Sequence, residues 1–249
     1  MADSTGTEQG GASVNADGAP DEIRRHLALA LDVDDAVTAF NAAHRLRPWF
    51  GVVKVGLELF TASGPDIVAR FINDGFDVFL DLKMVDIPTT VRKAARVAGS
   101  LGASYLTMYA HGGADMLRAG TEGMTEGAEL AGLEKPTTLA VTILTSDDTA
   151  PPHILGKRLM LAMEAGCGGV VCAASDLKEV RLLAPRMKRV VPGIRPASAP
   201  THDQARAATP AEAFTGGADL LVIGRAVMHA DNPQQAAAAI ADEITAARG

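Results

Sequence analysis

The residue types best suited to chemistry lie close together at positions 81–88, which read D-L-K-M-V-D-I-P. Side chains alternate across a strand, so Asp81 and Lys83 are predicted to point to one side and Leu82 to the other. Lys54, in the preceding predicted strand, can join them, and Asp86 follows shortly after. A lysine held as an ammonium ion between acids can stabilise a developing carbanion electrostatically and then donate a proton to it.

The same two acids argue against a different use of Lys83. A lysine that forms a Schiff base needs desolvation or neighbouring cations, which favour its neutral amine. Lys83 is flanked instead by Asp81 and Asp86, which favour the charged form, so a class I aldolase is disfavoured. A structural interpretation, in which these charges form a buried ion-pair network that closes one end of the fold, stays open at this point.

A second group of residues, near the end of the chain, is suited to binding a phosphate. The runs P-G-I-R-P and V-I-G-R each follow an apolar stretch and contain Arg195 and Arg225 respectively. Backbone N–H groups at a glycine turn and an arginine side chain are donors that fit a phosphate. Gly224, Arg225 and Arg195 are therefore predicted to bind phosphate, with Gln204 nearby.

The other polar residues give weaker signals. Asp32 follows the first predicted strand and Thr145 follows the fifth. The six histidines lack the spacing of metal ligands, because no H-E-x-x-H or H-x-x-x-H motif occurs. Ser146 has no G-x-S-x-G context, so a serine hydrolase is not indicated. We therefore expect no metal site and no nucleophilic serine.

Alternating strand and helix patterns would position these residues. From His26 onward, short apolar runs alternate with Ala-rich stretches that have helical spacing. The predicted strands are Leu27–Leu31, Gly51–Val55, Phe76–Leu80, Ser104–Met108, Thr138–Ile143, Gly168–Cys172, Arg189–Val191 and Asp219–Ile223. The predicted helices are Ala36–Leu46, Pro65–Asp74, Thr89–Leu101, Ala114–Leu130, His153–Glu164, Asp176–Ala184, Pro210–Thr215 and Pro233–Ala247.

Eight such units predict an α/β fold, a single (β/α)8 TIM barrel. The strand runs are continuously apolar, as in parallel strands that are buried on both faces. In a barrel of this kind the functional residues lie where strands end and βα loops begin, which is where the residues above are found. An open doubly wound sheet is the alternative, although no G-x-G-x-x-G follows the first strand.

Composition fits a soluble globular chain. It has 249 residues, 47% hydrophobic residues and a formal net charge of −7, which predict no nucleic-acid partner and no anionic membrane surface. No apolar run approaches the roughly 18–20 residues of a membrane span, and no secretory signal is visible.

Residues 1–20 are predicted to be a disordered tail before a barrel domain at 21–249. The two cysteines, Cys167 and Cys172, are too few for disulfide bonds to stabilise a chain of this length. We therefore expect a cytoplasmic protein.

Short motifs in chain order carry a resemblance to a known family. They are Leu31-Asp32, Lys54-Val55-Gly56, Asp81-Leu82-Lys83 through Asp86-Ile87-Pro88, Leu144-Thr145-Ser146, Pro192-Gly193-Ile194-Arg195-Pro196 and Ile223-Gly224-Arg225. Together, over about residues 26–248, they resemble the orotidine 5′-monophosphate decarboxylases. The combination of D-x-K-x-x-D-I-P with P-G-I-R-P and I-G-R is specific, whereas D-x-K-x-x-D alone is shared with enzymes of sugar phosphates.

The resemblance implies that the barrel removes CO2 from orotidine 5′-monophosphate to give uridine 5′-monophosphate, the last step of de novo pyrimidine biosynthesis. It implies a charged tetrad of Lys54, Asp81, Lys83 and Asp86, in which Lys83 is the general acid. Asp86 is expected to reach the site of the neighbouring subunit in a homodimer, and no cofactor or metal is implied. The implied substrate contacts are Asp32 to the ribose, Thr145 to the base, Thr90 elsewhere on the ligand, and Arg195, Gln204, Gly224 and Arg225 to the phosphate.

The chain departs from the family pattern outside the tetrad. Family members often have histidine at Val85, asparagine at Thr89 and histidine at Tyr109. Two other functions stay open: a metal-dependent sugar-phosphate synthase or decarboxylase of the same barrel superfamily, and a non-catalytic nucleotide-binding paralogue. The residues after the second acid, Ile87-Pro88, and Thr145 favour the nucleotide enzyme, while the intact tetrad argues against the paralogue.

Overall fold

Eight parallel strands close into a barrel in chain order, with β8 pairing back to β1. The computed structural model describes residues 18–144, 147, 149–151, 153–196 and 208–248. The strands are β1 (Leu27–Leu31), β2 (Val52–Gly56), β3 (Asp77–Met84), β4 (Tyr105–Tyr109), β5 (Thr137–Val141), β6 (Gly169–Val171), β7 (Lys188–Val191) and β8 (Leu220–Ile223). This confirms the predicted TIM barrel, and the alternative of an open sheet is wrong.

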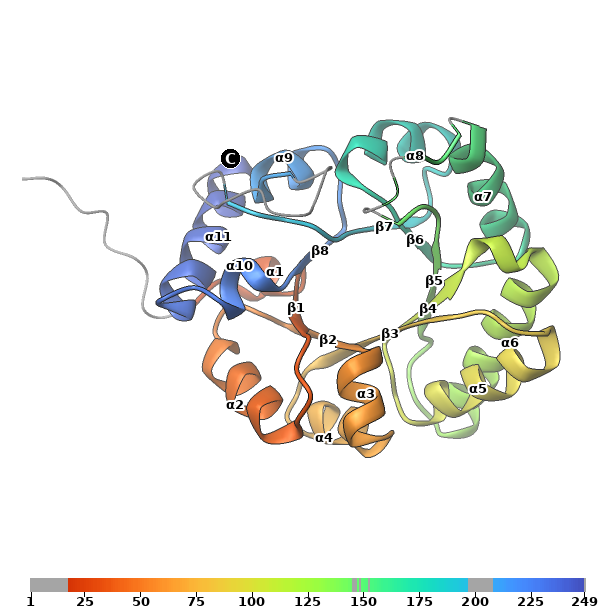
Figure 1. The fold of residues 1–249 in the computed structure, drawn as a ribbon, viewed down its shortest axis with the longest axis horizontal. Coiled ribbons are helices and arrows are strands. Elements are labelled where there is room, and N and C mark those ends of the chain that lie inside the picture. The colour runs from red at the N-terminus through yellow and green to blue at the C-terminus, as the bar shows by residue number, and fades with distance from the viewer. Residues whose placement is uncertain (1–17, 145–146, 148, 152, 197–207, 249) are drawn as a thin grey trace, which may run out of the picture.

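The helices surround the ring of strands, as Figure 1 shows in a view along the barrel. They are α1 (Asp21–Arg24), α2 (Ala36–Leu46), α3 (Leu57–Ser63), α4 (Asp66–Asn73), α5 (Pro88–Ser100), α6 (Ala114–Leu130), α7 (His153–Glu164), α8 (Leu177–Leu183), α9 (Pro210–Thr215), α10 (Arg225–Met228) and α11 (Pro233–Arg248), with 3-10 turns at Ala110–Gly112 and Ala174–Asp176. No helix in the described ranges combines the length and apolar content needed to cross a membrane.

Strand alternation divides the apolar side chains into two layers. In β1, Leu27, Leu29 and Leu31 pack in the large layer beneath the helices, whereas Ala28 and Ala30 belong to the barrel interior. Because both faces of each strand are covered, the strands are apolar at nearly every position, as the sequence pattern indicated. The interior layer consists of Ala28, Ala30, Val52, Phe79, Leu139, Val190, Leu220 and Val222.

The same alternation turns polar residues inward at the carboxyl ends of the strands. Lys54 pairs in register with Ala30 on one side and Phe79 on the other, so it shares their inward direction. Asp81 lies two residues after Phe79 on β3, and Thr107 lies two residues after Tyr105, the register partner of Phe79 on β4. Three polar side chains from neighbouring strands therefore converge directly above the apolar filling.

The largest difference from the predicted elements is in β3. It was predicted to end at Leu80, but it continues to Met84, so Asp81 and Lys83 lie within the strand. The helices α1, α3 and α10 were not predicted; α1 and α10 have four residues each, which is too few to show the helical period. The predicted tail falls mostly on residues 1–17, outside the described part.

Candidate active site

A cavity of about 410 Å³ opens at the carboxyl ends of the strands. Its charged side chains on β1–β3 and their ends are Asp32, Lys54, Asp81 and Lys83, and arginines follow β7 and β8. Apolar residues of β5 and β6 and of the loop after β5 line another part of the wall. A site of this volume, with both apolar and charged walls, suits a small organic molecule that carries charges. The lining residues are Ala30, Asp32, Lys54, Phe79, Asp81, Lys83, Val141, Ile143, Leu144, Val171, Pro192, Gly193, Ile194, Arg195, Val222, Gly224, Arg225 and Ala226.

Four charged groups alternate in sign across the wall of β1–β3. Lys54 Nζ donates to Asp32 Oδ1 at 2.9 Å and lies 3.6 Å from Asp81 Oδ2. Lys83 Nζ donates to Asp81 Oδ1 at 2.9 Å and to Oδ2 at 2.8 Å. The side chains of Lys54 and Asp81 are 10% and 12% exposed, whereas that of Lys83 is 35% exposed. Lys83 is therefore the ammonium group of this network that is most accessible to a ligand.

The electrostatics keep Asp81 ionised. Burial by itself raises the pKa of Asp81, but the ammonium groups of Lys54 and Lys83 lower it, and so do hydrogen bonds from Lys83 and Thr107. The result is a pKa below the ordinary value for aspartate. The ionised carboxylate of Asp81 is in direct contact with the Lys83 side chain.

The backbone of Lys83 has an unusual conformation. It is the one non-glycine residue of the described chain with a positive φ, at 47°, and this conformation costs an L-residue about 1–2 kcal/mol. Leu80 pairs with Leu106 and Met84 with Met108, so the register between β3 and β4 shifts around Lys83. Where the pairing of β3 with β4 is interrupted, Lys83 N–H donates to Thr107 Oγ1 at 2.8 Å, and Thr107 Oγ1 donates to Asp81 Oδ1 at 2.9 Å.

Gly56, at the end of β2, leaves space for the ion pair beside it. A Cβ atom at this position would lie 3.1 Å from Lys54 Nζ and 3.3 Å from Asp32 Oδ1. Any larger residue would push against both charged groups, so the absence of a side chain here is part of the site.

The structure places the predicted residues in three groups. Asp32, Lys54, Asp81, Lys83, Arg195, Gly224 and Arg225 all line the one cavity. Thr145 and Gln204 lie outside the described residues. Asp86 and Thr90 do not line the cavity but a shallow surface groove next to it, which also contains Lys83. Asp86 Oδ1 accepts from Ile87 N–H at 2.6 Å, so within one chain Lys83 is paired with Asp81 and not held between two acids.

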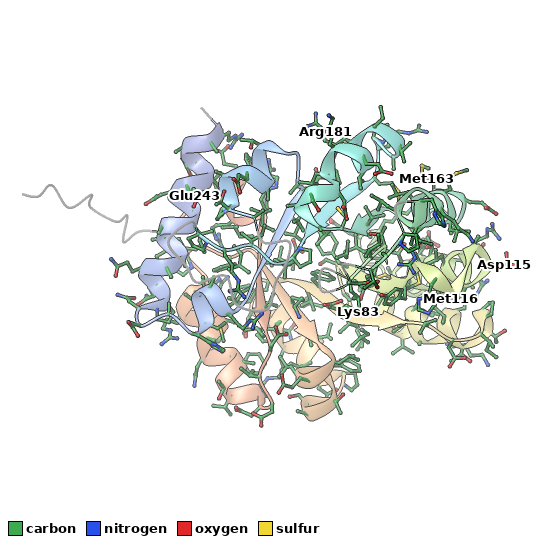
Figure 2. All side chains as sticks on the ribbon, turned by 45° about the horizontal axis from the view of Figure 1, so that its top comes forward. Lys83, Asp115, Met116, Met163, Arg181 and Glu243 are labelled. Carbon is green, nitrogen blue, oxygen red and sulfur yellow. The ribbon has the colours of Figure 1, made fainter. Side chains whose placement is uncertain are left out.

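Figure 2 shows the position of Lys83 relative to the rest of the molecule. Lys83 lies near the strands at the centre, whereas Asp115, Arg181 and Glu243 lie on the surrounding helices α6, α8 and α11. Sequence reasoning identified Lys83 but missed Thr107, which is fully buried. A threonine is common in strands, so within Tyr105–Tyr109 it gave no sign of a special role.

Comparisons with known proteins agree with the fold and identify the family of the chain. A model of the orotidine 5′-phosphate decarboxylase / HUMPS family matches residues 25–240. The chain belongs to this family. The membership confirms the resemblance drawn from the short motifs and the prediction of a carboxy-lyase.

Relatives within the orotidine 5′-phosphate decarboxylase family match nearly end to end. The orotidine 5′-phosphate decarboxylase of Anaeromyxobacter dehalogenans is 45% identical over 226 residues, which are 86% of this chain and 96% of that protein. The protein of the same name from Thermobifida fusca is 42% identical over 88% of this chain and 95% of its own length. The crystal structure of orotidine 5′-phosphate decarboxylase from Lactobacillus acidophilus has a TM-score of 0.74 and 32% identity, covering 88% of this chain and 99% of that one.

This family member has a second cavity at the amino ends of the strands. It also measures about 410 Å³, and Tyr105 is one of its lining residues. Phe79 lines the first cavity, and the rings of Phe79 and Tyr105 pack edge to face with centroids 6.0 Å apart. The barrel interior between the two cavities is therefore filled.

Proposed function

We propose that this chain decarboxylates orotidine 5′-monophosphate to uridine 5′-monophosphate and CO2, the last step of de novo pyrimidine biosynthesis, in the cytoplasm. The observation that carries the proposal is the ammonium group of Lys83, held against Asp81 in a cavity that also contains Arg195 and Arg225. Family membership supports the choice of substrate. The test is the change in ultraviolet absorbance of orotidine 5′-monophosphate on addition of purified protein, together with identification of the product.

The proposed chemistry needs one bond to break and one to form. The bond between C6 of the pyrimidine and its carboxylate breaks, the electron pair stays on C6, and CO2 leaves. Lys83 Nζ then donates a proton to C6, and its neutral amine regains a proton from water. The pyrimidine ring delocalises this carbanion poorly, so a fixed positive charge beside C6 lowers the barrier. Asp81 and Lys54 orient that charge before the substrate binds, so little reorganisation is needed.

The rest of the nucleotide would be held by the other polar groups of the site. Asp32 is proposed to contact the ribose, Thr145 the base, and Thr90 a further part of the ligand. The phosphate is proposed to bind Arg195, Gln204, Gly224 and Arg225, near the ends of β7 and β8. Binding energy from this remote group can be used to hold the ring against Lys83.

A metal-dependent reaction on a sugar phosphate is the alternative within the same family. The carboxylate of Asp81 accepts hydrogen bonds from Lys83 and Thr107 and lies beside a second ammonium group. A carboxylate neutralised in this way is a poor ligand for a divalent cation, which favours the metal-free reaction. No cluster of three or more His, Cys, Asp or Glu side chains that could hold a metal was found among the residues described.

We expect the decarboxylation rate to be unchanged, within about twofold, after dialysis against EDTA, because the proposed mechanism has no step that requires a Lewis acid. The measurement is the rate of loss of orotidine 5′-monophosphate before dialysis, after dialysis, and after adding back Mg²⁺. A rate that collapses with EDTA and returns with Mg²⁺ would contradict the metal-free mechanism. Tight binding of uridine 5′-monophosphate without any turnover would support the non-catalytic paralogue instead.

We also propose that the chain forms a homodimer in which Asp86 completes the partner's site. Asp86 and Thr90 lie on an exposed face that does not belong to their own cavity. On that face Val85, Ile87 and Val97 are 49%, 65% and 51% exposed, and exposed apolar residues of this kind are often covered by a partner. A twofold symmetric contact would place the same residues of each chain at the other chain's cavity.

A mixture of two inactive variants is expected to regain activity if Asp86 acts across the interface. Lys83→Ala and Asp86→Asn would each be inactive alone, but a mixed dimer has one site with both residues intact. Random reassociation after co-expression should restore up to about a quarter of wild-type activity, because half of the dimers are mixed and each has one intact site. The measurement is the specific activity of the co-expressed pair against each variant alone. No recovery from mixed dimers that are shown to form would contradict the shared site.

A further inference from the structure

We propose that Thr107 is a positioning residue for the proposed decarboxylation: its hydroxyl fixes both the backbone of Lys83 and the carboxylate of Asp81. The inference goes one step beyond the proposed function and rests on it, because it names the group that sets the geometry of the proton donor. Thr107 does not line the cavity and has no expected contact with the substrate.

The hydroxyl of Thr107 joins two groups that a regular strand would leave independent. It accepts from the Lys83 N–H at 2.8 Å and donates to Asp81 Oδ1 at 2.9 Å. The direction of both bonds is fixed, because a backbone N–H can only donate and an ionised carboxylate can only accept. The side chain is fully buried, so water cannot replace either partner.

The contact occurs where the β3–β4 ladder is interrupted. The register shift between Leu80 and Met84 leaves Lys83 N–H to be satisfied by a side chain, and the hydroxyl of Thr107 takes that place. It thereby helps to hold the positive φ of Lys83, which directs this side chain toward Asp81. Without the hydroxyl, a buried N–H loses its partner and the strained conformation loses one of its restraints.

The groups that contact the Asp81 carboxylate come from three neighbouring strands, and two of them are charged. Lys54 on β2, itself paired with Asp32, and Lys83 on β3 contact the carboxylate, while Thr107 approaches from β4. Loss of the hydroxyl removes one donor to the ionised form, so the pKa of Asp81 should rise from its lowered position. The function of ionised Asp81 is lost as the pH falls through this pKa, so the loss should begin at a higher pH in the variant.

Thr107→Val tests the inference because valine keeps the shape and β-branching but lacks the hydroxyl. We expect kcat for orotidine 5′-monophosphate to fall about 10- to 100-fold, the size expected for one lost hydrogen bond to a charged group, with KM changed less than about threefold. The acidic limb of the kcat–pH profile should move to higher pH. Thr107→Ser keeps the hydroxyl and should restore kcat to within about threefold of the wild type.

Thr138→Val is the matched control. Thr138 is a second buried threonine, on the next strand β5, and its hydroxyl bonds to Thr121 on α6 outside the barrel interior. Thr138→Val should lower the stability of the protein about as much as Thr107→Val does, but it should leave kcat and the kcat–pH profile unchanged. Thermal unfolding and binding of uridine 5′-monophosphate are measured for all variants. If Thr107→Val and Thr138→Val behave alike, or Thr107→Ser fails to restore kcat in a folded protein, Thr107 has only a structural role and the inference is overturned.

A readout without substrate separates this inference from the proposed function. Carbon NMR of ¹³C-labelled aspartate, with the Asp81 signal assigned through Asp81→Asn, reports the pKa of Asp81 directly. If the wild type does not decarboxylate orotidine 5′-monophosphate, the proposed function fails. A higher pKa of Asp81 in Thr107→Val would still support positioning, and an unchanged pKa would overturn it.

Discussion

Replacing Lys83 by alanine is expected to lower kcat for orotidine 5′-monophosphate by at least about 10³-fold, because in the proposed mechanism this residue supplies both the positive charge beside C6 and the proton that C6 receives. The fold should persist, since the Lys83 side chain is 35% exposed and its backbone contact with Thr107 does not involve the ammonium group. The measurement is single-turnover loss of substrate absorbance with enzyme in excess. Binding of uridine 5′-monophosphate, followed by calorimetry, should change far less than kcat.

Lys178→Ala is a suitable control for this variant. Lys178 is an exposed lysine on α8, on the outer ring of helices, and its removal changes the net charge by the same amount. The control should retain wild-type kcat and KM. A folded Lys83→Ala protein with kcat within about tenfold of the wild type would contradict the assignment of Lys83 as general acid.

Replacing Arg225 by alanine should have the next largest effect, on KM. Arg225 begins α10 directly after β8 and lines the cavity. Losing a charge-assisted hydrogen bond to a phosphate should raise KM about 10- to 100-fold. We expect a smaller fall in kcat as well, because binding energy from the phosphate contributes to holding the pyrimidine against Lys83. Steady-state kinetics with orotidine 5′-monophosphate measure both.

The nucleoside orotidine provides the decisive comparison for Arg225. It has no phosphate, so its kcat/KM should be low in the wild type and unchanged in Arg225→Ala. Arg186→Ala, an exposed arginine before β7 at the opposite end of the barrel, controls for the loss of a positive charge. An unchanged KM for orotidine 5′-monophosphate, or an equal loss with orotidine, would place the phosphate elsewhere.

The sequence was most informative where one physical rule governs a position. Continuous apolar runs predicted parallel buried strands, and alternation placed Asp81 and Lys83 on one side, as the structure has them. Because the parallel strands of such a barrel all end at one face, polar residues far apart in the sequence, such as Asp32 and Arg225, could be assigned to one cavity.

What the sequence did not reveal depends on contacts between strands. Nothing in residues 81–88 indicates a positive φ at Lys83, because the register shift and the hydroxyl of Thr107 on the next strand stabilise it. The space that Gly56 leaves for the ion pair of Lys54 and Asp32 likewise depends on β2 lying beside the end of β1. We predicted that Lys83 lies between two acids, but within one chain it pairs only with Asp81 among the described residues. Asp86 is near Lys83 in the sequence, but its carboxylate accepts a hydrogen bond from the Ile87 N–H instead.

The edge-to-face packing of Phe79 against Tyr105 makes the reaction chamber a dead end. Within the described residues this packing closes the barrel between its two ends, so substrate, CO2 and the nucleotide product of the proposed reaction would share the opening at the carboxyl ends of the strands. The product nucleotide would then have to dissociate from the cavity before the next substrate molecule can bind. The departing product and the arriving substrate would therefore compete for the same opening.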